Sequence, residues 1–301
     1  MATNKRPECY NGQLNLKASG VQILFTAEQV DEWIKCFKNP IYFIKKYVKV
    51  IHVDRGTVPF ALYPFQEDII RTYHENRKAV VLTARQMGKT ITTAAYFLWV
   101  ILFNSDKNIA ILANKAAMAR EILSRIKFSY ENLPSWIQQG VVEWNKGSIQ
   151  LDNNSKIFTA ATSPNAIRGQ SCTHVYVDEI AFIPNNIAEE FMTSVFPVLS
   201  SGKETKIFIS STPKGMNMFY KIWVEANAGR NGFIPLNIPW SAHPDRNQAW
   251  YDEQVKNLGP VKSAQEIDCV GPDTLITVRN KSTKKIETIT ISTLQERLNK
   301  I

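Results

Sequence analysis

The residues with the clearest chemical potential are Gly88, Lys89 and Thr90, which join an apolar run to a helical pattern. KAVVLT (78–83) leads through ARQMGKT into ITTAAYFLWVILF. Glycine lets the backbone approach a phosphate group, the N–H groups of a helix N-terminus face an anion, lysine adds positive charge and threonine can ligate Mg²⁺. We therefore predict a phosphate-binding loop, although the usual spacing would place glycine where Thr83 stands. The alternative is an ordinary strand-to-helix turn.

Two carboxylates, Asp178 and Glu179, follow another apolar run in THVYVDEIAF (173–182). In a nucleotide site Asp178 would hold Mg²⁺ through water, and Glu179 would polarise the attacking water. Alone, an acidic pair that ends a strand is typical of a solvated edge or a helix cap. Downstream of the loop around Lys89, the pair favours hydrolysis of a nucleoside triphosphate.

Four further residues are candidates for the same site. Tyr63 and Gln66, in LYPFQEDII, offer ring stacking and amide hydrogen bonds to a purine base, although Pro64 could simply begin a helix there. Ser211 and Thr212, in ISSTPKG, are small hydroxyl residues that could sense the γ-phosphate and relay its loss, or form an ordinary turn.

Two arginines could add positive charge to the site. Arg85 lies inside the loop and could act as an arginine finger from the same chain, which would neutralise charge on the transferred phosphoryl group. The alternative for Arg85 is a solvent-facing position or a structural ion pair. Arg168, in AIRGQS, could contact nucleotide or DNA, but we favour a role in bracing its own loop.

These residues need a scaffold that brings them together. Apolar, β-rich runs at 78–83, 108–114, 156–162, 173–180 and 206–213 alternate with helical patterns such as 115–131 and 215–228. This alternation predicts an α/β fold of the P-loop NTPase class, with a mostly parallel central sheet and helices on both faces. Ligands of such sheets bind at the carboxyl ends of the strands, where the candidate residues stand.

Residues 1–60 have a different pattern, which predicts a helical and basic N-terminal segment. Thr26 and Gln29 match a helix capping box there. The helical faces favour a packed subdomain over a dedicated binding surface.

The composition narrows the functional class. The 301 residues are 44% hydrophobic and 21% charged, and no run of about 20 apolar residues could span a membrane. Four scattered cysteines do not suit a disulfide framework, so we expect a reducing, intracellular compartment. The net charge of +9 permits a polyanionic partner but does not identify one.

At this point the motifs resemble a known family. TARQMGKT, GVVEWNKGSIQLDNNSKI, SPNAIRGQS, VYVDEIAFIP and ISSTPKGMNMFYKIW, in this order, are similar to the ATPase half of the large terminase subunit of tailed phages, T-even type, over roughly residues 55–268. A phosphate loop that lacks the first glycine and carries Arg85 and Gln86 is the family's own variant. The resemblance implies an ATP- and Mg²⁺-dependent motor that moves double-stranded DNA into a procapsid.

The resemblance also implies roles for individual residues and partners. Lys89 and Thr90 would bind phosphate and Mg²⁺, Asp178 would end the acidic motif, and Glu179 would be catalytic. Ser211 and Thr212 would couple hydrolysis to movement, Tyr63 and Gln66 would contact adenine, and Arg85 would be the finger, which a neighbouring subunit supplies in some relatives. The expected partners are a portal ring, the small terminase subunit and further copies in a ring, in the cytoplasm of the infected host. The family's C-terminal nuclease domain has no match in these residues.

The last part of the chain resembles another protein. Cys269 begins CVGPDTLITV, which is similar to the first block of an intein, and its thiol could convert the Asp268–Cys269 amide to a thioester. The alternative is a terminase cysteine followed by a divergent linker. We expect this fragment to require further intein sequence, either from a longer chain or from a partner half in trans.

We therefore expect three regions: a helical segment (1–60), a terminase P-loop ATPase domain (61–268) and an incomplete intein domain (269–301). Two other functions stay open at this stage. One is another ATP-dependent nucleic-acid translocase or helicase, and the other is an inactive precursor half that awaits splicing.

Overall fold

The computed structural model describes residues 8–200, 202–268, 275–280, 283–290, 293–294 and 297. Its α-helices are α1 (Ala27–Lys38), α2 (Pro40–Tyr47), α3 (Pro64–Glu75), α4 (Lys89–Phe103), α5 (Ala116–Glu131), α6 (Asn185–Ser200), α7 (Met218–Asn227), α8 (Gln248–Leu258) and α9 (Pro260–Ser263). Its strands are β1 (Lys49–His52), β2 (Gly56–Pro59), β3 (Lys78–Thr83), β4 (Asn108–Ala113), β5 (Val141–Trp144), β6 (Ser148–Leu151), β7 (Lys156–Ala161), β8 (His174–Asp178), β9 (Lys206–Ser211), β10 (Ile234–Ile238), β11 (Leu275–Arg279) and β12 (Ile286–Thr290).

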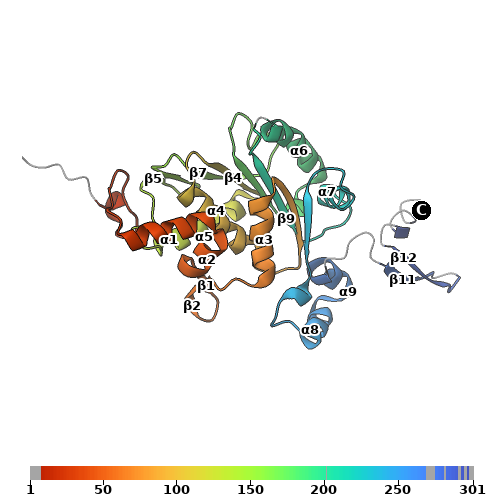
Figure 1. Cartoon of the computed structure of the whole chain (residues 1–301). Coiled ribbons are helices and arrows are strands. Elements are labelled where there is room, and N and C mark those ends of the chain that lie inside the picture. Colours follow the sequence, from red (N-terminus) through yellow and green to blue (C-terminus); the bar gives the residue numbers. More distant parts are fainter. Residues whose placement is uncertain are drawn as a thin grey trace, which may run out of the picture.

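The centre of the fold is an eight-stranded sheet in the order β10-β3-β9-β8-β4-β7-β6-β5. The first six strands in this order are parallel to their neighbours, whereas β6 and β5 continue the sheet antiparallel. Helices α3, α4 and α5 lie on one side of the sheet, and α6 and α7 lie on the other (Figure 1). The predicted α/β fold with a mostly parallel sheet is confirmed.

The five predicted apolar runs all form strands of this sheet, but its three further strands were not predicted. Strands β5 and β6 are four residues each and form a hairpin around Asn145 and Ser148, so they are too short to show a clear alternation. Strand β10 contains Pro235, which argues against a strand in the sequence. A proline is tolerated here because β10 is the edge strand and pairs only with β3.

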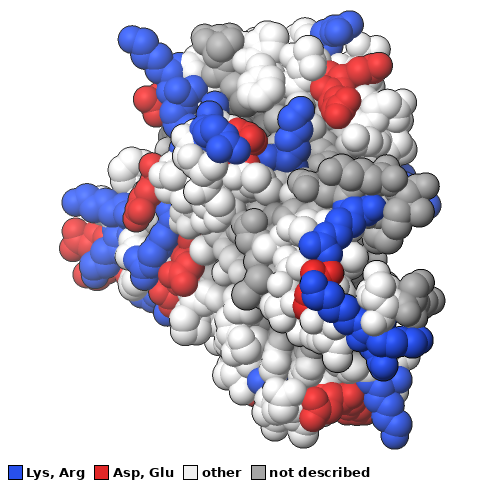
Figure 2. Space-filling model, turned by 90° about the vertical axis from the view of Figure 1, so that its right-hand side faces the viewer, with Lys and Arg blue, Asp and Glu red and all other residues white. Residues whose placement is uncertain are grey.

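Charged side chains on the surface are mixed in sign. On the face shown in Figure 2, lysines and arginines lie in several groups among acidic side chains and do not form one continuous basic surface. The net charge of the chain is therefore a poor guide to where this face would meet an anion.

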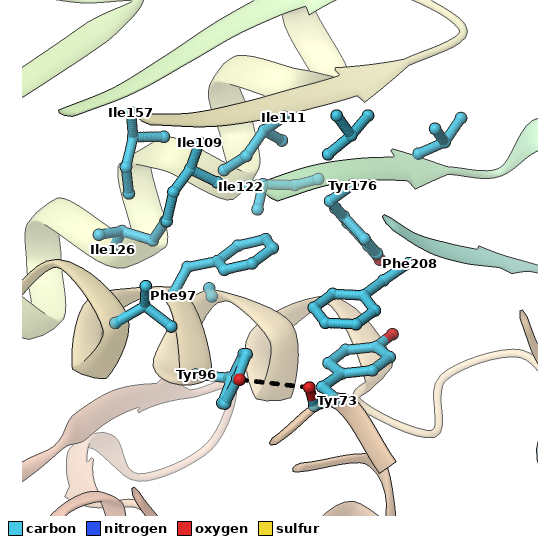
Figure 3. Packing of buried hydrophobic residues seen from close by; sticks show 14 of the residues in the cluster. Tyr73, Tyr96, Phe97, Ile109, Ile111, Ile122, Ile126, Ile157, Tyr176 and Phe208 are labelled. Atoms are coloured by element: carbon cyan, nitrogen blue, oxygen red, sulfur yellow. Dashed lines mark hydrogen bonds between the residues drawn. The ribbon is translucent and has the colours of Figure 1, made fainter. Parts of the chain in front are cut away.

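The core forms between the sheet and α4, which is the most completely buried helix. All residues of α4 except Thr90 and Ile91 are buried, as expected for a helix that is apolar on every side. Phe208 of β9 stacks on Tyr73 of α3, with ring centroids 4.0 Å apart, and both lie beside the aromatic residues of α4 (Figure 3). This packing fixes α3 and α4 against the strands whose ends carry the candidate site.

The N-terminal region contains the helices α1 and α2, but the helical prediction for residues 1–60 is wrong for residues 49–59. Helix α1 begins with the predicted capping box of Thr26 and Gln29. Residues 49–59, however, form the hairpin β1–β2, because β-branched residues on both strands flank a turn that ends at Gly56, whose φ of 66° suits glycine. Trp99 of α4 donates a hydrogen bond to the Cys36 carbonyl (2.8 Å), which ties α1 to the central layer.

The described residues of the tail form a separate antiparallel pair, β11 with β12. Cys269, the predicted intein nucleophile, lies outside the described residues. Within the described ranges, no helix combines the length and the apolar character needed to cross a bilayer.

Candidate active site

The loop between β3 and α4 has the geometry of an anion-binding turn. Strand β3 ends at Thr83, and Gly88 precedes the first turn of α4 with a φ of 74°, which a glycine adopts without strain. A Cβ on Gly88 would lie 2.5 Å from the Gln66 side-chain nitrogen. The sequence therefore needs glycine here for two reasons, backbone conformation and the close approach of α3.

Lys89 joins the loop to both predicted carboxylates. Its Nζ donates a short hydrogen bond to Glu179 and lies 3.5 Å from the Asp178 carboxylate. Burial lowers the pKa of Lys89, but the two carboxylates outweigh burial and hold the pKa above its usual range. The structure therefore brings together a buried cation and two acids from elements ninety residues apart.

Ser211 and Thr212 contact Glu179 directly. The Ser211 hydroxyl and the Thr212 N–H both donate to Glu179 Oε2, at 3.0 and 3.2 Å. Glu179 itself has a φ of 53°, in the left-handed region that is uncommon for a residue with a side chain. Such a backbone strain is often found at functional sites, and here the end of β9 holds the strained residue in place.

Asp178 is held by two residues that the sequence analysis did not single out, Tyr176 and Ser210. The Tyr176 hydroxyl donates to Asp178 Oδ1 (3.0 Å), Ser210 Oγ donates to the same oxygen (2.9 Å), and the two hydroxyls lie 2.7 Å apart. All three side chains are buried. Ser210 stands opposite Asp178 in the parallel register of β8 and β9, which the sequence alone does not specify.

Thr90 and Asp178 supply the oxygen donors expected for Mg²⁺. Thr90 is partly exposed in the first turn of α4, and the Asp178 carboxylate is 5% exposed at the end of β8. A hydroxyl and a carboxylate are hard oxygen ligands, and magnesium is usually held by one or two such groups together with phosphates and water. The donor set fits this ion.

Tyr63 and Gln66 flank the loop from the start of α3. The Gln66 amide accepts from the Tyr63 N–H (3.0 Å), which caps the helix, and donates to the Met87 carbonyl (3.4 Å). The Tyr63 ring contacts Phe65 and His243, with centroids 5.5 and 4.7 Å away. Pro64 does begin a helix, as the alternative interpretation of this segment has it, and Gln66 also contacts the loop.

Arg85 points to the C-terminal segment rather than to Lys89. Its guanidinium is exposed and lies 3.5 Å from the Glu266 carboxylate. The backbone N–H of Arg85 donates to the Glu266 carbonyl (2.8 Å). The ion-pair alternative therefore describes this conformation. The Gln86 side chain is also exposed, on a residue with a φ of 59°.

Arg168 is exposed on the loop between β7 and β8, beside Glu190 of α6. Its guanidinium makes no ion pair within the described part of the chain. The expected bracing of this loop comes instead from backbone hydrogen bonds, such as that from the Arg168 N–H to the Asn165 carbonyl.

Comparisons with known proteins identify the family and the fold. A model of the N-terminal region of the large terminase subunit, T4-like virus type, matches residues 80–275, so its C-terminal limit falls inside the expected tail. The ATPase domain of the large terminase of Thermus phage P74-26 is 21% identical, with a TM-score of 0.60; the match covers 70% of this chain and 95% of that domain.

Two matches to large terminases show how much of such a protein this chain spans. The large terminase of bacteriophage HK97 is 16% identical, with a TM-score of 0.62, over 82% of this chain and 57% of that one. A large terminase of a thermophilic bacteriophage in complex with ATP-γ-S is 12% identical, with a TM-score of 0.53, over 68% and 51%. The chain thus spans about half the length of these two proteins.

Proposed function

Because this chain belongs to the T4-like family of phage terminase large subunits, we propose that it hydrolyses ATP to drive the packaging of double-stranded DNA into a procapsid. The observation that carries the proposal is the placement of Lys89 between Asp178 and Glu179 at the carboxyl ends of parallel strands. The complex of a related fold with ATP-γ-S supports a nucleotide as the ligand.

The contacts of Lys89 define its part in the reaction. Lys89 pairs with the buried Asp178 carboxylate and the partly buried Glu179 carboxylate. An incoming triphosphate offers stronger negative charge to the same ammonium group, so Lys89 exchanges partners and frees Glu179 to polarise water. Mg²⁺, which Thr90 and Asp178 would hold, supplies charge neutralisation on the phosphates when bound.

The hydroxyl end of β9 is the proposed coupling element. Ser211 and Thr212 both donate hydrogen bonds to the carboxylate of Glu179. If this carboxylate moves on phosphate release, these hydrogen bonds transmit the movement directly to the end of β9. Tyr63, Gln66 and Gln86 complete the proposed nucleotide site, and Arg85 is the proposed finger once it leaves Glu266. We propose a portal ring, the small terminase subunit and further copies in a ring as partners, in the host cytoplasm.

The catalytic assignment is tested by Glu179→Gln. We expect kcat for ATP to fall at least about a hundredfold, because the amide cannot accept a proton from water, while ATP binding persists. The control is Glu253→Gln, on the exposed face of α8, which should hydrolyse ATP as the wild type does. Equal rates in all three proteins would contradict the assignment.

For the tail we propose the start of an intein, on the resemblance around Cys269 alone. Its thiol would attack the Asp268 carbonyl, so that the amide becomes a thioester and the nitrogen of Cys269 becomes an amine. Co-expression with candidate C-terminal intein halves, followed by mass spectrometry, tests the split form. The split form is supported if a ligated terminase appears and if Cys269→Ala abolishes its formation. The absence of ligation with every candidate half would refute the split form.

A further inference from the structure

A second arginine, Arg246, contacts the phosphate loop from outside. It lies between the short helix at Trp240–Ala242 and α8, far along the chain from the loop. One guanidinium nitrogen donates to the Arg85 carbonyl (3.1 Å) and the other to the Gln86 carbonyl (3.0 Å). Two hydrogen bonds to successive carbonyls suit the planar, charged fork of arginine.

These two bonds determine where the adjacent N–H groups point. In a trans peptide group, the carbonyl oxygen and the N–H of the next residue face opposite directions. A guanidinium that holds the carbonyls of Arg85 and Gln86 outward therefore turns the N–H groups of Gln86 and Met87 to the opposite side of the loop. The positive charge also polarises both peptide groups, which makes them better donors to an anion.

The two preceding N–H groups of the loop already have acceptors. Those of Ala84 and Arg85 donate to the carbonyls of Ile238 and Glu266. Within the described part of the chain, the N–H groups of Gln86 and Met87 donate to no protein acceptor. Two of the free donors of the loop are thus N–H groups that Arg246 orients.

The loop needs such support because its backbone is unfavourable. Gln86 has a φ of 59°, which costs a residue with a Cβ about 1 kcal/mol or more. Arg246 is itself fixed, because it is half-buried and its guanidinium lies 4.5 Å from the centroid of the Trp250 ring. A rigid cation therefore faces the most strained part of the loop.

We propose that Arg246 is a positioning residue that holds the phosphate loop open for the polyphosphate of the nucleotide. It acts through the backbone of Arg85 and Gln86 and does not touch the reacting atoms. The inference rests on the proposed ATPase function and extends it to a residue outside the loop and the acidic motif. It also means that movement of the segment before α8 changes phosphate affinity.

The test compares Arg246→Gln and Arg246→Lys with the wild type in the full chain. Calorimetry with ADP and with pyrophosphate should show Kd values about tenfold to a hundredfold higher for Arg246→Gln, because two charge-assisted hydrogen bonds are lost. The Kd values of Arg246→Lys should lie between those of the wild type and Arg246→Gln, since lysine retains the positive charge but lacks the forked guanidinium. In steady-state kinetics, KM for ATP should rise more than kcat falls.

A matched control is Arg230→Gln, which removes an exposed arginine paired with Glu225 and should bind ADP normally. The melting temperature without ligand separates a local from a global defect, and it should match the wild type in Arg246→Lys. If Arg246→Gln and Arg246→Lys both bind ADP and pyrophosphate as tightly as the wild type, the proposal is overturned. If the wild type binds no ADP, the proposed function itself fails.

Discussion

At the scale of single residues, the two serine hydroxyls at the end of β9 bind different carboxylates of the site. Ser210 donates to Asp178, whereas Ser211 donates to Glu179. Both serines are fully buried, so neither hydroxyl can exchange its partner for bulk water. Because residues that orient a metal-binding carboxylate tune metal affinity, the two serines should have different kinetic signatures.

We predict that Ser210→Ala weakens the binding of Mg²⁺ more than it weakens the binding of the nucleotide. The change removes one donor from Asp178 and leaves the Tyr176 hydroxyl without one of its two partners. The Mg²⁺ concentration that half-activates ATP hydrolysis should rise about tenfold. Ser211→Ala is the matched comparison and should lower kcat at an unchanged Mg²⁺ requirement. Identical Mg²⁺ curves for Ser210→Ala and the wild type would refute this division.

At the scale of elements, β3, the loop and α4 form one unit whose shape depends on Gly88. The φ of 74° disfavours a residue with a Cβ, and a Cβ would lie 2.5 Å from the Gln66 side-chain nitrogen. A Cβ would displace the Gln66 amide, which also caps α3 and bonds the Met87 carbonyl. The loop and α3 are therefore coupled through one glutamine.

Gly88→Ala should thus do more than strain the backbone. We predict a loss of ADP affinity of at least about tenfold, because displacement of the Gln66 amide breaks its hydrogen bond to the Met87 carbonyl of the loop. Gly229→Ala is the control: its φ of 70° imposes similar strain, but no atom lies within 4 Å of its Cβ. Both variants should lose about 1 kcal/mol of unfolding free energy, and only Gly88→Ala should lose ADP binding. Normal ADP binding by Gly88→Ala would contradict the coupling.

At the scale of the whole molecule, one buried histidine links stability to pH. His174 begins β8 in the core, where burial and the positive charges of Lys206 and Lys107 lower its pKa to about 3. The folded protein therefore keeps this ring neutral, whereas the unfolded chain protonates it near its usual pKa of about 6.5.

The unfolding free energy should consequently fall as pH falls from about 6.5 toward 3, by up to about 1.4 kcal/mol per pH unit from this group. Urea unfolding between pH 7 and 5 measures the slope. His174→Gln should reduce the slope of unfolding free energy against pH. His52→Gln should not, because the His52 side chain is 40% exposed. A slope that His174→Gln leaves unchanged would show that other groups cause the acid sensitivity.

Much of the site could be predicted because its residues stand beside recognisable local patterns. Gly88, Lys89 and Thr90 follow a strand and begin a helix, and Asp178 and Glu179 end a strand, so rules for parallel sheets place them at one edge. The hairpin of residues 49–59 and strand β10 were missed, because a short strand or an edge strand with a proline carries little periodicity.

The sequence by itself determined the fold class, the phosphate loop and the acidic pair, since each depends on residues close together in the chain. Only the tertiary structure decided which groups surround them. The pairing of Ser210 with Asp178 follows from the register of β8 against β9, and the contacts of Arg246 and Glu266 with the loop follow from how the chain returns after β10. Such contacts depend on packing between distant segments, and no local spacing records them.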